Sequence, residues 1–192
     1  MLARLAALGL AIPAALTRPG RAAAAAAAPW DPRYQLTLTL QLADMGPRAE
    51  RPFVAMWIEN GSGQEVRTLA VWLHSQTGEQ YIDSVRSWYR AYLARRDSTR
   101  VDLLRTVSAP TRRPGTYTLY WDGKDNAGRP VEQGRYNVCV EGAREFGGYS
   151  MMRKAFTFGA APFRSEIEAN GTVISVAVAD YGPRGGPAGA AR

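Results

Sequence analysis

Apolar and polar side chains alternate with a period of two between Tyr34 and Leu42. Leucine occupies every second position from Leu36 onward, and glutamine or threonine occupies the positions between them. Because successive side chains of a β-strand point to opposite faces, this pattern predicts a strand with one buried face and one solvent-facing face. The chain is therefore expected to build a sheet that covers a hydrophobic core on one side.

Further short apolar segments have the length and composition of β-strands. They are residues 52–59, 66–73, 115–121, 135–141, 150–158, 163–169 and 172–179. Turn residues separate several of them, as in Asn60–Gly63 and Asn170–Gly171, where asparagine and glycine tolerate positive φ. Many short strands with such turns predict a mainly β fold, an antiparallel β-sandwich, rather than a parallel α/β sheet. Three tryptophans in these strands are expected in the core, namely Trp57, Trp72 and Trp121.

One segment, about residues 84–96, has the periodicity of an amphipathic helix inserted between strands. Its apolar side chains recur on one helical face at Val85, Trp88, Tyr89, Tyr92 and Leu93. Asp83 or Ser84 is placed to cap its N-terminus. We expect this helix to cover one end of the sandwich. The alternative is a basic aromatic helix that docks an anionic cofactor or partner, with Trp88, Tyr89 and Arg90 in contact with it.

The first 28 residues predict an export signal followed by an alanine-rich cleavage region. A basic residue, Arg4, precedes an apolar stretch from Leu5 to Leu16, which is shorter than the ~20 residues that a membrane-spanning helix needs. Small residues then offer cleavage sites between about Ala24 and Pro29. We therefore expect a periplasmic protein with one domain over residues 29–181 and a flexible Gly/Pro/Ala tail over residues 182–192.

Composition excludes several classes of site. The chain has a single histidine, His74, and a single cysteine, Cys139, so the usual zinc sites and disulfide frameworks are excluded. Its formal charge of +7 falls to about +4 without the three arginines of the leader, and no Lys/Arg block indicates nucleic-acid binding. We expect Cys139 to be a buried strand residue and His74 to end a strand.

Known catalytic motifs are absent from the sequence. It has no G-x-S-x-G or S-x-x-K nucleophile motif and no phosphate-binding glycine loop. The segment WDGKDNAG resembles part of a calcium loop, but the spacing and the bidentate glutamate are missing, so we expect Asp122, Asp125 and Asn126 to hold a turn. A hydrolase that uses carboxylates such as Glu141 and Glu145 is the remaining enzymatic alternative. We expect no enzyme and no metal site.

The stretch from Thr111 to Glu141 reads TRRPGTYTLYWDGKDNAGRPVEQGRYNVCVE. It resembles the PG-x-Y-x-x-x-WDG-x-D-x-x-G-x-P-V-x-x-G-x-Y signature of bacterial extracytoplasmic Ig-like domains, including that of the flagellar hook-cap protein. The resemblance implies an Ig-like β-sandwich in which this stretch forms a hairpin. Its structural positions here are Trp121, Asp122, Gly123, Asp125, Gly128 and Gly134.

Neighbouring segments extend the resemblance to about residues 34–180. In order, they read RPFVAMWIENGSGQEVRTLAVWL, VRSWYR and EGAREFGGYSMM, which is similar to the predicted periplasmic proteins of domain-of-unknown-function family 2271. The family pattern Arg-Glu-His-Gly-Gly-Tyr matches at Gly147, Gly148 and Tyr149, but Phe146 replaces the histidine. The resemblance implies a small secreted sandwich. Members of the family tend to be encoded near flavin-transfer enzymes and PepSY-type membrane proteins, which implies extracytoplasmic redox or metal-linked work.

Thr111 is the candidate for covalent flavin attachment. Enzymes that attach flavin mononucleotide (FMN) to exported proteins recognise Asp-x-x-Ser-Gly-Ala-Thr and load the final threonine, and Thr111 occupies the equivalent place. Arg105 replaces the acid, Ala109 replaces the glycine, and Pro110 stiffens the segment. We therefore predict no covalent flavin here, and we expect Ser108–Thr111 to be only a turn that leads into the next strand.

Two functions remain as hypotheses. The first is a non-enzymatic exported protein without a cofactor, which binds an unknown periplasmic partner or serves as a scaffold for a membrane-associated redox or metal-linked system. The alternative is a redox carrier that holds FMN, with Trp88, Tyr89 and nearby arginines around the flavin.

Overall fold

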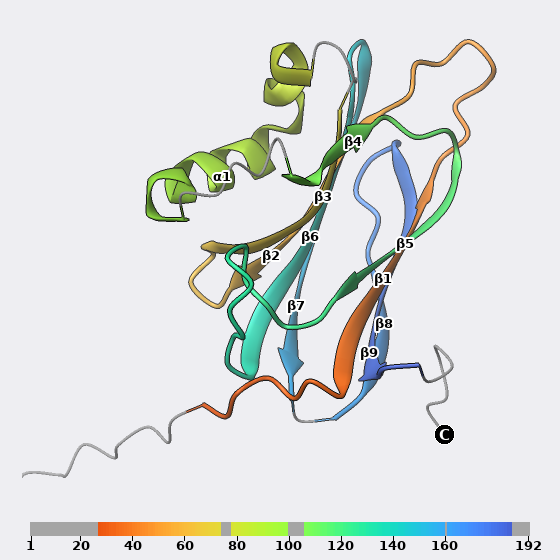
Figure 1. The fold of residues 1–192 in the computed structure, drawn as a ribbon. Helices are drawn as coiled ribbons and strands as arrows, with labels where there is room; N and C mark the ends of the chain where they lie inside the picture. Colours follow the sequence, from red (N-terminus) through yellow and green to blue (C-terminus); the bar gives the residue numbers. More distant parts are fainter. Residues whose placement is uncertain (1–26, 74–77, 100–105, 160, 186–192) are drawn as a thin grey trace, which may run out of the picture.

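The computed structural model describes residues 27–73, 78–99, 106–159 and 161–185. The chain folds into two packed β-sheets with a helical layer on one side (Figure 1). The elements in chain order are β1 (Tyr34–Leu42), β2 (Phe53–Asn60), β3 (Glu65–Leu73), the 3₁₀ helix η1 (Gly78–Val85), α1 (Arg86–Thr99), β4 (Ser108–Pro110), β5 (Gly115–Trp121), β6 (Gly134–Arg144), β7 (Gly147–Phe158), β8 (Phe163–Ile167) and β9 (Ile174–Pro183).

The smaller sheet has the strand order β5-β1-β9-β8 and the larger sheet has the order β4-β3-β2-β6-β7. Every pair is antiparallel except β3 and β4, which run parallel. The predicted mainly β sandwich with one helix is confirmed. β9 runs to Pro183, two residues into the segment that we expected to be a tail, and residues 186–192, the first 26 residues and His74 lie outside the described residues.

The main core lies between the two sheets. The four alternating leucines of β1 are all buried there, as their period of two predicts. An aromatic cluster fills one part of this core and consists of Trp30, Trp121, Tyr136, Phe158 and Tyr181. Trp57, Trp72 and Trp121 are each no more than 5% exposed.

Gly123 is required by this aromatic cluster. Its φ is +73°, and a Cβ atom at this position would lie 2.0 Å from the indole of Trp30. Any other residue would therefore have to push Trp30 out of the core as well as adopt a strained backbone.

A second core lies on the outer face of the larger sheet, under η1 and α1. Trp57 of β2 and Val71 of β3 meet Val85 and Trp88 there, and Cys139 of β6 is also buried in this cluster. The helical layer thus covers a face of the larger sheet, whereas we expected it to cover one end of the sandwich. The central strand β2 is consequently buried on both sides.

The helix also differs from the prediction in its bounds. Residues 78–85 form a 3₁₀ helix, α1 begins at Arg86 and extends to Thr99, and Leu93 is 43% exposed instead of buried. The expected caps Asp83 and Ser84 lie within η1. The acceptor for the first backbone N–H groups of α1 comes instead from Glu141 of β6, far away in the sequence.

Candidate functional site

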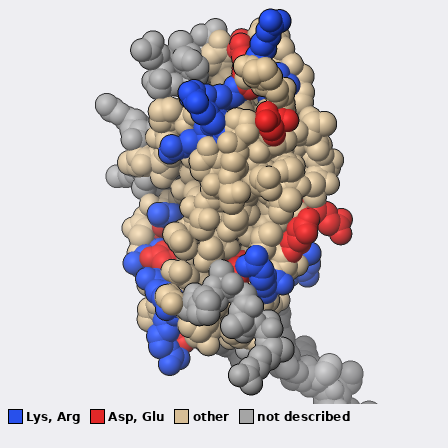
Figure 2. Space-filling view, turned by 90° about the vertical axis from the view of Figure 1, so that its right-hand side faces the viewer, with Lys and Arg blue, Asp and Glu red and all other residues tan. Residues whose placement is uncertain are grey.

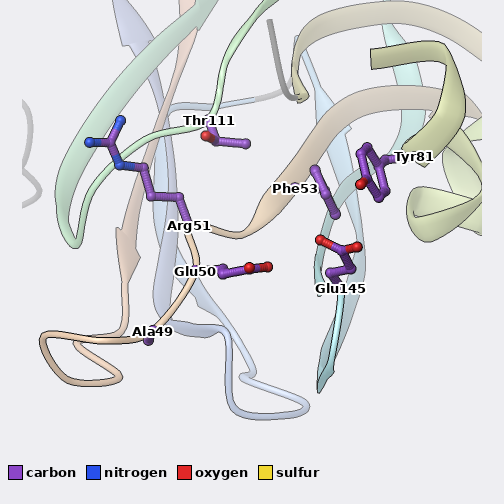
Figure 3. A pocket seen from close by; sticks show the side chains of 7 residues that line it. All are labelled: Ala49, Glu50, Arg51, Phe53, Tyr81, Thr111 and Glu145. Carbon is purple, nitrogen blue, oxygen red and sulfur yellow. The ribbon is translucent and has the colours of Figure 1, made fainter. Parts of the chain in front are cut away.

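A cavity with a volume of about 530 Å³ opens where four segments of the chain meet. We call it the Tyr81 cavity; its lining residues are Ala49, Glu50, Arg51, Phe53, Tyr81, Thr111 and Glu145 (Figure 3). They come from residues 49–53, which lead into β2, from η1, from the residue after β4 and from the β6–β7 turn. This volume lies within the range of small-molecule sites in proteins.

Two aromatic rings form one wall of the Tyr81 cavity. Phe53 and Tyr81 stack with their ring centroids 5.1 Å apart and an angle of 17° between the ring planes. Phe53 is the first residue of β2 and is buried, whereas Tyr81 of η1 is half-buried. The 3₁₀ helix therefore brings an aromatic ring and its hydroxyl to the cavity.

Two carboxylates face this aromatic wall. In Figure 3 the side chain of Glu50 extends toward Glu145, and the carboxylate of Glu145 points up toward Phe53 and Tyr81. The guanidinium of Arg51 points away from both carboxylates. The negative charge of Glu145, together with burial, a hydrogen bond to Glu145 and the charge of Glu50, raises the pKa of Tyr81. Both carboxylates thus act on the same phenol, and they place negative charge beside the aromatic wall.

Thr111 lies in the wall of the cavity, but it belongs to an edge of the larger sheet. The preceding residues Ser108–Pro110 form strand β4 on β3, and the backbone N–H of Thr111 donates to the carbonyl of Leu73 at 3.1 Å. The guanidinium of Arg112 lies over the ring of Trp72 at 5.6 Å. The expectation that this segment is only a turn is wrong, because it continues the sheet.

The candidate residues on the helix do not line the Tyr81 cavity. Trp88 of α1 is fully buried, stacks on Tyr92 and donates its indole N–H to the hydroxyl of Thr68 at 2.9 Å. Tyr89 is half-buried and Arg90 is exposed. Trp88 is therefore a core residue with no face open to a cofactor.

Glu141, which the sequence offered as a catalytic carboxylate, is fully buried and caps α1. It accepts hydrogen bonds from the backbone N–H groups of Ser87 and Trp88 at 2.9 to 3.1 Å and from the hydroxyl of Tyr149 at 2.6 Å. The guanidinium of Arg86 lies over the Tyr149 ring at 4.3 Å. A carboxylate at a helix N-terminus is stabilised by the unpaired amides and the helix dipole. Glu141 and Tyr149 thus join the helix to the sandwich.

The WDGKDNAG turn is held by its own side chains. The carboxylate of Asp125 accepts from the backbone N–H groups of Ala127 and Arg129 and forms an ion pair with the Arg129 side chain at 2.8 Å. These bonds and the ion pair lower the pKa of Asp125 against the opposing effect of burial. Within the described residues, no group of three or more His, Cys, Asp or Glu side chains could hold a metal ion.

Asn126 of the same turn reaches a buried carboxylate on β3. Its side-chain amide donates to Glu65 at 2.7 Å, and the Thr68 hydroxyl donates to the same oxygen at 2.9 Å. Burial raises the pKa of Glu65, although these two hydrogen bonds and the charges of Arg95 and Arg67 act in the opposite direction. This carboxyl therefore takes up a proton at a higher pH in the folded state than in the unfolded chain.

This difference in pKa predicts how stability depends on pH. The contribution of Glu65 is complete below the ordinary pKa of an unfolded glutamate, about 4.3. It is lost as pH rises through the higher pKa of the folded state. We expect Glu65→Gln, which keeps the acceptor oxygen, to gain stability relative to the wild type between pH 4 and pH 7. Thermal unfolding of both proteins across this range tests it, and a variant that loses relative stability with rising pH would contradict it.

Cys139 is buried in β6, and burial raises the pKa of its thiol strongly. Glu59 and Arg153 form an ion pair at 2.5 Å, and both interact with the thiol. A thiol in this environment stays protonated at neutral pH and is a poor nucleophile.

The fold and the cavity together define a β-sandwich with an open acidic and aromatic cavity at the helical layer. A family model described as "Predicted periplasmic protein (DUF2271)" matches residues 34–174, and the chain belongs to this family of periplasmic proteins. No curated protein and no solved structure matches the chain. No helix in the described part of the chain is long and apolar enough to cross a membrane.

The sequence indicated only two lining residues of the cavity: Thr111 as a flavin attachment site and Glu145 as a hydrolase carboxylate. It missed Glu50, Phe53 and Tyr81. Their spacing carries no motif, because Glu50 and Phe53 lie in one segment and Tyr81 in another, and only the tertiary fold brings these segments together with Thr111 and Glu145.

Proposed function

We propose that this periplasmic protein acts by binding and that the Tyr81 cavity holds a cationic group, such as an ammonium on an apolar stem, of a ligand or partner protein. One observation carries the proposal: two carboxylates and a stacked aromatic pair meet in one cavity of about 530 Å³. A cation gains from the carboxylates by charge and from the ring faces by cation–π attraction.

The surroundings of Glu141 and Glu145, the two hydrolase candidates, favour binding over catalysis. Glu141 has its oxygens occupied by the cap of α1 and is fully buried. Glu145 is exposed at the β6–β7 turn. The two glutamates named as hydrolase candidates therefore have different surroundings, and only Glu145 reaches the Tyr81 cavity.

The proposal is tested by titrating 1,4-diaminobutane into the protein in low-salt buffer and following the heat of binding. We expect saturable binding by the wild type and a loss of at least about tenfold in affinity for Glu145→Gln, which corresponds to about 1.4 kcal/mol. Glu168→Gln, at an exposed glutamate outside the cavity, is the matched control for the change in net charge. Equal binding by all three proteins, or none by the wild type, would reject the proposal.

The alternative is a carrier of covalent FMN on Thr111. One feature of the structure argues against it. The segment before Thr111 is paired to β3, so a transferase would have to detach a strand.

We therefore predict that Thr111 stays unmodified. Co-expression with a flavin transferase, followed by intact mass measurement, should show no added FMN. The triple variant Arg105→Asp/Ala109→Gly/Pro110→Ala restores the Asp-x-x-Ser-Gly-Ala-Thr pattern at residues 105–111 and serves as the positive control. FMN on Thr111 of the wild type would favour the redox carrier instead.

A further inference from the structure

The four edges of the two sheets differ in how they are protected. An exposed edge strand presents unpaired backbone groups that can pair with another chain, and natural proteins block such edges with charges, proline or short length. β4 has three residues and ends in Pro110, β7 carries Arg153 and Lys154, and β8 carries Arg164 and Glu166. These three edges are protected in the usual ways.

β5 is the unprotected edge. Its seven residues, Gly115–Trp121, contain no charge and no proline, and the strand pairs with β1 in regular register along its whole length. Within the described residues its other edge has no β partner. On the outer face of the sheet Tyr120 is 62% exposed.

The interior beside β5 is also incompletely covered. Tyr117 and Leu119 point between the sheets but are only half-buried, whereas the leucines of the neighbouring strand β1 are fully buried. Figure 2 shows the side of the molecule that carries the smaller sheet, and there the charged side chains lie toward the two ends and the margins around a broad uncharged area. Surface without charged side chains thus covers the middle of this side of the molecule.

We propose that two copies of this chain associate by antiparallel pairing of β5 with β5, so that the smaller sheets join into one. A two-fold axis at Thr118, the central residue of β5, pairs all seven residues. Thr116 then lies opposite Tyr120 of the second copy, and Tyr117 lies opposite Leu119. Pairs of aromatic and β-branched or aliphatic side chains are favourable across antiparallel strands.

The charges at the ends of β5 fit the same arrangement. The exposed residues Arg112 and Arg113 precede the strand, and Asp122 follows it. In the pairing centred on Thr118 the basic start of each strand lies beside Asp122 of the other. Asp122 has an ion pair with Lys124 at 3.0 Å and a longer one with Arg184 at 3.9 Å. Its side chain is still 35% exposed, so Arg113 of the second copy can reach it as a further basic partner. In a two-fold symmetric interface this contact occurs twice.

The first test places a charge at residue 118, which lies on the proposed two-fold axis. In sedimentation experiments on the protein from the periplasmic fraction, we expect the average mass of the wild type to rise toward twice the monomer mass with concentration. Thr118→Asp and Thr118→Lys should each stay monomeric, because like charges then face each other, whereas an equimolar mixture should regain the dimer. Thr157→Asp, at an exposed threonine of edge strand β7, is the control and should behave as wild type.

A second variant does not depend on charge. Thr118→Cys should form a covalent dimer under mild oxidation, and Thr157→Cys should not, because cysteines facing each other across paired strands come within disulfide distance. A monomeric wild type at all concentrations, a mixture of charged variants that stays monomeric, or equal cross-linking of both cysteine variants would overturn the proposal.

Discussion

Replacing Trp121 by alanine should lower the free energy of unfolding by about 4 kcal/mol, the largest effect that we expect from a single substitution. Trp121 is 1% exposed and contacts the rings of Trp30, Tyr136 and Phe158 at centroid distances of 4.7 to 5.4 Å. The indole N–H donates to the carbonyl of Lys124 at 2.9 Å, so its loss also frees the turn that follows β5. In a chain of this length the change corresponds to a fall in Tm of about 10 °C.

Thermal and urea unfolding measure this effect. The control is Phe146→Ala, because Phe146 is 78% exposed, and its loss should change stability by less than about 0.5 kcal/mol. A Trp121→Ala protein that melts with the wild type would show that the aromatic cluster does not stabilise the sandwich.

Replacing Glu141 by alanine should cost about 3 kcal/mol and should loosen the helical layer first. The change leaves the backbone N–H groups of Ser87 and Trp88 and the hydroxyl of Tyr149 without their acceptor, and buried donors without a partner are costly. Amide hydrogen exchange in residues 86–92 should accelerate before exchange in β2 and β6 does.

Two variants separate the cap from general effects. Glu141→Gln keeps the shape and one acceptor oxygen, so it should lose less stability than Glu141→Ala. Glu168→Ala, at an exposed glutamate, should leave hydrogen exchange in α1 unchanged. Uniform acceleration of hydrogen exchange over the whole chain in Glu141→Ala would instead show that Glu141 stabilises the whole sandwich and not the helical layer in particular.

The sequence predicts the strands well where one face is buried. β1 and β5 have the predicted bounds, because alternation or apolar runs with clear turns mark both. β4 was missed, since a three-residue strand has no period and pairs only through a parallel contact with β3. The shift of β9 toward Pro183 has a related cause, because the strand follows its partner β1 beyond the apolar run that marked it.

The cap of α1 and the Tyr81 cavity were beyond sequence reasoning for a different reason. Local patterns nominate caps from neighbouring residues such as Ser84, whereas the actual acceptor Glu141 lies 54 residues after Ser87. Periodicity placed Trp88 on an apolar face, which is where the structure has it, but gave no means of separating a core ring from a cofactor-binding ring.

The burial of β2 on both faces has a consequence for how this strand finds its place. When one face of a strand is exposed to solvent, a shift of its pairing by one residue would expose its apolar side chains. The alternation of polar and apolar residues then determines the register of the strand by itself. In β2 the residues facing the sandwich, such as Met56, and those facing the helical layer, such as Trp57, are all apolar. Side-chain volume must therefore select the register, together with the one carboxylate at the end of the strand, Glu59, which accepts a hydrogen bond from the indole of Trp57 at 2.9 Å. Exchanging a large and a small apolar side chain between neighbouring β2 positions should therefore destabilise the protein, although the hydrophobicity of the strand is unchanged.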